Sequence, residues 1–190
     1  MLNAKYVAKV LMRPGSVVVM PTDTIYGLVA RALDPVAVSR LYALKDRHSK
    51  PGTMLGLDIE QLSSLGIARR YLKAVEQFWP GAVSVVIPID NHPTFSYLSQ
   101  GRADLAVRIP DNSFVASVLA LSGPLMTTSV NPPSLAPAEN IVRAKEYFGG
   151  RVDAYFDGGD LAGRQPSTII RVIDDSVELI RRGSVELPGV

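Results

Sequence analysis

The segment from Val17 to Leu28 reads VVVMPTDTIYGL, an apolar run that passes directly into small polar side chains. Val17 to Met20 is short, apolar and mostly β-branched, which predicts a buried strand. Hydroxyl and carboxylate groups directly after a strand suit a small polar ligand, because loops there project from the sheet. An ordinary turn, in which threonine and aspartate side chains of this segment bond their own backbone, explains the same residues as well.

Helices and strands are expected on both sides of this segment. Apolar residues at helical spacing, the N-cap residue Asp34 and the first-turn Pro35 predict helices, and β-branched runs predict strands. The expected helices span 3–11, 35–45, 59–78 with a break near Gly66, 113–121 and 139–148. The expected strands span 17–20, 53–57, 83–87, 105–109, 125–129, 168–173 and 177–180, with Asp174-Asp175 as the last turn. This mixture predicts an α/β or α+β fold around one twisted sheet, as a single domain over residues 1–190.

The composition excludes several classes of protein. The 190 residues contain no cysteine, which excludes disulfides and thiol catalysis and removes the soft ligands of structural zinc. A formal charge of +2 is too balanced for a protein that grips nucleic acid mainly by charge. No apolar run approaches the roughly 20 residues of a membrane helix, so a cytoplasmic protein without membrane contact is expected. Motifs for a P-loop, a dinucleotide fold, a zinc hydrolase and a nucleophile elbow do not occur.

Cations are placed where an anion could bind. Lys45, Arg47 and Lys50 lie within six residues at the end of an expected helix. They either face an anion or form a solvated basic helix end. Arg108 ends an apolar strand and needs a carboxylate partner, which either a ligand or a structural salt bridge supplies.

Three further segments could place polar groups at the sheet edge. Residues 127–131 carry hydroxyls and an amide from a strand into a proline-rich loop, which is either a pocket wall or a capped turn. Residues 166–168 open an expected strand, and residues 181–183 close the last one. For these last two segments an ordinary turn is the simpler interpretation.

Taken in order, these segments resemble one family. The chain contains P-T-D-T-x-Y-G, K-x-R…K-P, A-V-R-x-P, S-x-N, D-G-G, P-S-T and R-x-G at 21–27, 45–51, 106–110, 129–131, 157–159, 166–168 and 181–183. Their order is similar to that of the YrdC-like (TsaC-type) threonylcarbamoyl-AMP synthase family, in its short single-domain form. The resemblance covers about residues 15–185. It implies an open, twisted, mostly antiparallel or mixed sheet flanked by helices, with a concave basic cavity.

The resemblance also implies an activity. The family makes L-threonylcarbamoyladenylate and pyrophosphate from L-threonine, bicarbonate and ATP with Mg²⁺, which is nucleotidyltransferase chemistry. The product passes to a downstream tRNA-modifying transferase complex that modifies adenosine next to the anticodon, so contact with tRNA is a further expectation. The resemblance implies that threonine is bound by Thr24, Arg108, Ser129 and Ser167. It implies that ATP is bound by Arg47, Lys50, Asn131 and Arg181. The catalytic residues that it implies are Lys45 and Arg47. No metal ligand in the chain is assigned.

Three departures from the family pattern concern ATP. The basic motif is one residue shorter, with His48 in place of a proline and Gly52 in place of a leucine. Residues 132–134 read P-P-S where L-S-G is common, and Asp104 replaces a hydroxyl before A-V-R. A carboxylate there opposes phosphates unless it binds Mg²⁺ or points away.

These departures leave two other functions open. The first is a non-catalytic RNA-binding or ribosome-maturation factor with the same fold. The second is a carbamoyl-transferring domain of the kind found in hydrogenase maturation, although such domains usually accompany zinc-finger segments and this chain has no cysteine.

Overall fold

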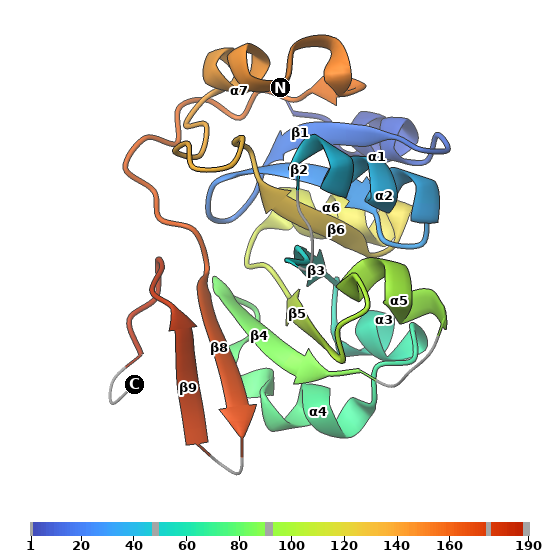
Figure 1. Cartoon of the computed structure of the whole chain (residues 1–190), viewed down its shortest axis with the longest axis vertical. Helices are drawn as coiled ribbons and strands as arrows, with labels where there is room; N and C mark the ends of the chain where they lie inside the picture. Colours follow the sequence, from blue (N-terminus) through green and yellow to red (C-terminus); the bar gives the residue numbers. More distant parts are fainter. Residues whose placement is uncertain (1, 47–49, 90–92, 174–175, 188–190) are drawn as a thin grey trace.

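The computed structural model describes residues 2–46, 50–89, 93–173 and 176–187. Within these residues nine strands form one sheet in the order β7-β1-β2-β6-β3-β5-β4-β8-β9 (Figure 1). The strands are β1 Val17–Pro21, β2 Tyr26–Arg31, β3 Thr53–Leu55, β4 Val83–Pro88, β5 Asp104–Arg108, β6 Leu125–Ser129, β7 Ala154–Tyr155, β8 Thr168–Ile173 and β9 Ser176–Arg181.

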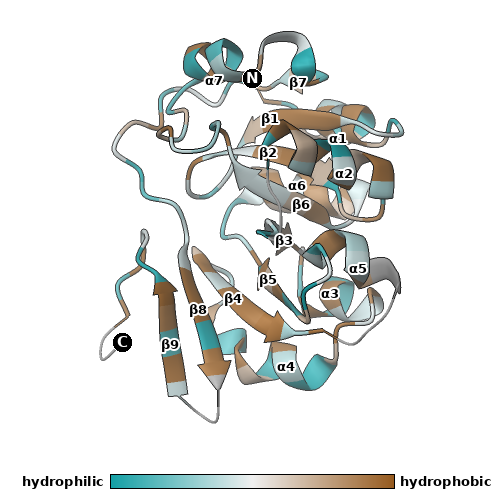
Figure 2. Ribbon diagram, viewed as in Figure 1, coloured by the Kyte–Doolittle hydropathy of each residue, from teal (hydrophilic) through white to brown (hydrophobic). Residues whose placement is uncertain are grey.

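The sheet is mixed and mostly antiparallel. Antiparallel pairs join β1 to β2, β2 to β6, β3 to β6, β4 to β5 and β8 to β9. The pairs β1–β7, β3–β5 and β4–β8 are parallel. This pairing confirms the predicted mixed sheet. Figure 2 labels β7 at one end of the molecule and β8 and β9 at the other, and residues 156–167 cross between them.

Helices cover the sheet, and side chains cap most of them. The α-helices of the described residues are α1 Ala4–Leu11, α2 Pro35–Leu44, α3 Ile59–Ser64, α4 Arg69–Ala74, α5 Pro93–Ser99, α6 Ser113–Ser122 and α7 Ile141–Phe148, and the 3-10 helices are η1 Glu76–Phe78 and η2 Gly149–Arg151. The side chains of Asn3, Asp34, Asp58, Asn112 and Asn140 each accept a backbone N–H at a helix start. Each such cap stabilises its helix by about 1 kcal/mol. None of the described helices is long and apolar enough to span a bilayer.

The strand β1 is buried on both faces. Val18 and Met20 pack in one cluster with residues of α1 and α6, whereas Val17 and Val19 pack in a larger cluster with residues of α2. Alternate side chains of a strand point to opposite faces, so a strand covered on both sides reads as a continuous apolar run. Figure 2 shows hydrophobic residues along β1 and β4, while β9, at the edge, mixes hydrophobic and hydrophilic ones.

Most predicted elements are confirmed, with small shifts at their ends. The strands at 125–129 and 168–173 have the predicted bounds, and the expected helix at 59–78 is divided into α3, α4 and η1. The strands β2 and β7 and the helix α5 were not predicted. The predicted turn at Asp174-Asp175 lies outside the described residues.

Candidate functional site

A polar cavity of about 110 Å³ lies where the loop between β1 and β2 meets β5, β6 and the ends of β8 and β9. Its lining among the described residues contains two arginines and no acidic side chain. The predicted site residues that line it are Thr24, Arg108, Ser129, Ser167 and Arg181. All four residues predicted for threonine therefore meet in one cavity, although they come from four distant parts of the chain.

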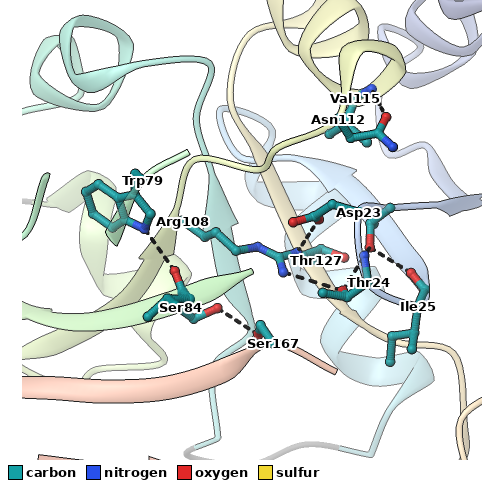
Figure 3. Close-up of polar contacts among 12 residues, drawn as sticks. Asp23, Thr24, Ile25, Trp79, Ser84, Arg108, Asn112, Val115, Thr127 and Ser167 are labelled. Atoms are coloured by element: carbon teal, nitrogen blue, oxygen red, sulfur yellow. Dashed lines mark hydrogen bonds and ion pairs between the residues drawn. The ribbon is translucent and has the colours of Figure 1, made fainter. Parts of the chain in front are cut away.

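Arg108 forms a buried ion pair at this cavity. Its side chain is 4% exposed, and its Nη2 lies 3.2 Å from Oδ1 of Asp23, which is 5% exposed. Its Nη1 donates to Oγ1 of Thr24 at 3.4 Å, and its buried Nε has no hydrogen-bond partner among the described residues. Figure 3 shows the Asp23 carboxylate and the Thr24 hydroxyl facing the guanidinium. Both contacts are long, so the guanidinium keeps hydrogen-bonding capacity for a further anion.

Burial shifts the pKa of both members of this ion pair. Burial raises the pKa of the Asp23 carboxyl above its ordinary value, and the nearby Arg108 charge opposes that shift. Burial also lowers the pKa of the Arg108 guanidinium, and Asp23 opposes that shift. The structural salt bridge anticipated for Arg108 is thus present. Because Arg108 also lines the cavity, this salt bridge is compatible with a role in binding a carboxylate.

The loop between β1 and β2 combines a turn with a binding surface. Oγ1 of Thr22 donates to the carbonyl of Ile25 at 2.7 Å and accepts from the N–H of Thr24 at 3.2 Å. Thr22 therefore forms the ordinary turn, as one of the two interpretations anticipated. That turn points Asp23 and Thr24 toward Arg108, which is 84 residues from Thr24.

The hydroxyl of Ser167 contacts two neighbouring side chains. Oγ of Ser167 lies 2.9 Å from Oγ of Ser84, a fully buried residue on β4. Nη2 of Arg181 donates to the carbonyl of Ser167 at 2.6 Å and to its Oγ at 3.3 Å. A Cβ on Gly183 would lie 2.5 Å from the carbonyl carbon of Ser167, so glycine allows the segment after β9 to pack directly on this turn.

Lys45 contacts the protein rather than the cavity. It is 2% exposed, does not line the cavity, and its Nζ donates to the carbonyl of Ser129 at 2.8 Å and to Oδ1 of Asn131 at 2.8 Å. Nζ also donates to the carbonyl of Asn131. Oγ of Ser129 donates to Oδ1 of Asn131 at 2.6 Å. Lys45 thereby fixes the loop that carries two predicted site residues, and its catalytic role stays a prediction.

The other residues predicted for ATP are less well placed. Lys50 is exposed, its backbone N–H donates to Oε1 of Gln100 at 2.8 Å, and it does not line the cavity. Arg47 lies outside the described residues, as does His48. Of the four residues predicted for ATP, Arg181 is therefore the one that the described structure places in the cavity lining.

Asp104 does not line the cavity. Its carboxylate accepts from Nε of Arg102 at 2.7 Å and from Nη2 of Arg171 at 2.8 Å. The hydrogen bond from Arg102 lowers the pKa of Asp104. Two arginines thus compensate the charge that replaces the family's hydroxyl.

Gly52 explains one departure from the family pattern. A Cβ on Gly52 would lie 2.3 Å from the carbonyl oxygen of Thr127, and the N–H of Gly52 donates to the Tyr42 hydroxyl at 3.2 Å. The shortened basic motif therefore passes so close to β6 that it leaves no room for a side chain at this position.

Several residues at the site were not predicted. Ser84 contacts Ser167, and Asp23 pairs with Arg108. The Tyr26 hydroxyl accepts from the N–H of Gly158 at 2.8 Å, which fastens the D-G-G segment to the start of β2. A single polar residue inside the apolar run at 82–87 was a usable signal for Ser84, because buried strands seldom contain an isolated hydroxyl. The Asp23 carboxylate was expected either to suit a polar ligand or to bond its own backbone, but its pairing with Arg108 was not predicted.

A larger hollow of about 570 Å³ lies near Trp79 and Asp111 and contains none of the predicted residues. Three of its acidic side chains have partners in the described structure: Asp58 accepts from the N–H of Gln61 at 2.7 Å, Glu60 pairs with Arg69 at 2.6 Å, and Glu76 pairs with Lys73 at 2.6 Å. We therefore take the smaller cavity around Arg108 as the candidate site.

The fold and the cavity define a mixed α/β protein with a buried arginine beside a polar pocket. Residues 10–183 match the model of the Sua5/YciO/YrdC family, described as "Telomere recombination", and the chain belongs to that family. The chain is 35% identical over 183 residues to the threonylcarbamoyl-AMP synthase of Stutzerimonas stutzeri (strain A1501), covering 94% of this chain and 96% of the relative. It is 32% identical to the threonylcarbamoyl-AMP synthase of Bacillus subtilis (strain 168), of which it spans 53%.

A solved structure supports the same assignment. P. abyssi Sua5 complexed with L-threonine matches 95% of this chain with a TM-score of 0.82 and 29% identity. This chain spans 54% of that protein. The predicted family and the predicted fold class are both confirmed, while the basic character of the cavity stays a prediction.

Proposed function

We propose that this protein is an L-threonylcarbamoyladenylate synthase, which makes threonylcarbamoyl-AMP and pyrophosphate from L-threonine, bicarbonate and ATP. The observation that supports this most is the convergence of Thr24, Arg108, Ser129 and Ser167 on one cavity. These four residues were predicted as a threonine site from motifs far apart in the sequence. Relatives that carry this enzyme's name cover nearly the whole chain.

Arg108 is the proposed partner of the threonine carboxylate. A guanidinium presents several N–H donors in a fixed plane, which match the two oxygens of a carboxylate. Arg108 is buried and its contacts to Asp23 and Thr24 are long, so it can accept a further anion without leaving its place. With the carboxylate held there, Ser129 and Ser167 also line the cavity around the ligand.

The proposed reaction needs positioned cations rather than a covalent intermediate. The amine of threonine attacks the carbon of bicarbonate to form a carbamate with loss of water, and a carbamate oxygen then attacks the α-phosphate of ATP while pyrophosphate leaves. In both steps, negative charge accumulates in a small volume. Fixed cations stabilise that charge and align the reactants. We propose three residues for this role: Arg181, which lines the cavity, and Arg47 and Lys50.

Mg²⁺ enters this proposal together with ATP. The described residues contain no group of three or more His, Asp or Glu side chains able to hold an ion. The phosphates of the nucleotide are therefore the ligands that would bring Mg²⁺ to the cavity, where it supplies further positive charge. The nucleotidyltransferase class, a downstream tRNA-modifying complex, contact with tRNA and a cytoplasmic location all stay proposals at this stage.

Release of pyrophosphate tests the proposed reaction. We expect the purified protein, given bicarbonate, MgATP and L-threonine, to release pyrophosphate at a rate that rises with threonine and saturates. A coupled phosphate assay measures the rate, and L-serine or L-valine in place of L-threonine are the matched controls. Pyrophosphate release that does not depend on threonine contradicts the proposal.

The same preparation tests the RNA-binding alternative. If the protein releases no pyrophosphate but binds tRNA tightly, with an affinity that falls steeply with salt, the alternative is supported. We expect the opposite result, because a net charge of +2 is small for binding by charge alone and the relatives bear an enzyme's name.

A further inference from the structure

The buried hydroxyl of Ser84 lies directly behind the cavity. Ser84 is fully buried on β4, in the middle of an otherwise apolar strand, and it does not line the cavity. Among the described residues the single hydrogen-bond partner of its Oγ is Oγ of Ser167, at 2.9 Å. Figure 3 shows Ser84, on β4, and Ser167, directly before β8, with their hydroxyls facing each other.

Counting donors and acceptors fixes the direction of this hydrogen bond. A hydroxyl has one proton to donate and two lone pairs that accept. If Ser167 donated to Ser84, the proton of Ser84 would have no acceptor among the described residues, and an unsatisfied buried donor is unfavourable. Ser84 is therefore the donor and Ser167 the acceptor.

Arg181 also contacts the Ser167 hydroxyl. Nη2 of Arg181 donates to the carbonyl of Ser167 at 2.6 Å and makes a longer contact of 3.3 Å with its Oγ. The Ser167 hydroxyl accepts from Ser84 and lies beside a cationic donor, so the group that it can still offer a ligand is its own proton. Ser167 lines the cavity, so that proton is available to a bound ligand. Such a site selects a hydrogen-bond acceptor and disfavours an ammonium group.

We propose that Ser84 is a positioning residue that fixes the Ser167 hydroxyl as a donor toward an anionic oxygen of the ligand. This inference rests on the proposed function, under which the ligand is L-threonine or the carbamate formed from it. Without Ser84, the Ser167 hydroxyl regains a free lone pair and rotational freedom, so it no longer presents a donor in a fixed direction.

A double-mutant cycle tests this coupling directly. L-Threonine is titrated calorimetrically into the wild type, Ser84→Ala, Ser167→Ala and the double variant. We expect Ser84→Ala to weaken binding by ~10-fold, the net strength of about one hydrogen bond. The double variant should bind no more weakly than Ser167→Ala, because Ser84 acts through Ser167. Ser84→Thr, which keeps the hydroxyl on a side chain suited to a strand, should bind threonine close to the wild-type affinity.

Ser122→Ala is the matched structural control. Ser122 is 5% exposed, and its hydroxyl donates to the carbonyl of Val118 at 2.9 Å, but it lies on α6 and does not line the cavity. It should lower the melting temperature about as much as Ser84→Ala and leave threonine binding unchanged. If Ser84→Ala does not fold, Ser84→Cys replaces it, since a thiol fills the same space and is a weak donor.

The outcomes separate this inference from the proposed function. The role of Ser84 is overturned if the wild type binds threonine and Ser84→Ala binds it equally well, or if the two substitutions have additive effects in the double variant. The enzyme assignment then stays intact. A wild type that binds no threonine overturns the proposed threonine site and the role of Ser84 together.

Discussion

Replacing Arg108 with alanine is expected to raise the KM for L-threonine by at least about 100-fold, with a much smaller change in the KM for ATP. The physical reason is the loss of two charge-assisted hydrogen bonds to the substrate carboxylate, each worth roughly 1.5–3 kcal/mol. Burial already raises the pKa of Asp23, so its carboxyl can take up a proton when the arginine is removed, which limits the structural damage. Steady-state kinetics with each substrate varied in turn measures the effect.

Three variants make the Arg108 result specific. Arg108→Lys keeps a positive charge but loses the planar fork, so it should recover only part of the threonine affinity. Arg143→Ala removes an exposed arginine that pairs with Glu146 on α7 and should leave both KM values unchanged. Arg47→Ala should raise the KM for ATP rather than for threonine. An Arg108→Ala enzyme with an unchanged threonine KM contradicts the assignment.

Replacing Gly52 with alanine is expected to destabilise the protein by about 3 kcal/mol, the upper part of the range for overpacking a tight site. The added Cβ would lie 2.3 Å from the carbonyl oxygen of Thr127 and 3.0 Å from Cγ2 of Thr128. The first of these atoms belongs to the backbone of β6, so it cannot rotate away as a flexible side chain can. Gly52→Leu, which restores the family's residue, should be worse. Denaturant unfolding measures both changes.

Gly150→Ala provides the control for Gly52. A Cβ at Gly150 meets no atom within 4 Å, so this variant should change the free energy of unfolding by less than about 0.5 kcal/mol. A Gly52→Ala protein as stable as Gly150→Ala would mean that the segment after Lys50 does not lie against β6 as described. The explanation for the shortened basic motif would then be wrong.

Whether a strand or helix could be predicted from the sequence depended on how its residues are buried. The strand β6 was predicted with its bounds because its apolar residues follow the break at Gly123-Pro124. The strand β2 was missed because it follows a polar loop, contains Gly27 and is buried on both faces, so it shows no alternation. The helix α5 has seven residues, which is too few for a clear helical period.

Prediction of the candidate site was limited by contacts between residues that lie far apart in the sequence. Sequence reasoning established that Arg108 needs a carboxylate, but Asp23 lies 85 residues earlier, and no local pattern reveals such a pairing. It also could not establish whether Asp104 faces the phosphates, because that depends on Arg171 from the strand β8, next to β4. The threonine residues were predictable through the order of motifs, since each motif ends or begins a strand beside the same cavity.

The most direct test of the central claim is to identify the product. The protein is incubated with L-threonine, MgATP and ¹³C-labelled bicarbonate, and the reaction is quenched and analysed by mass spectrometry. We predict a threonine-dependent species with the mass of threonylcarbamoyl-AMP, shifted by one mass unit by the labelled carbon, and absent when threonine or bicarbonate is omitted. Consumption of ATP without such a species, or no reaction by folded protein that binds threonine, would contradict the claim.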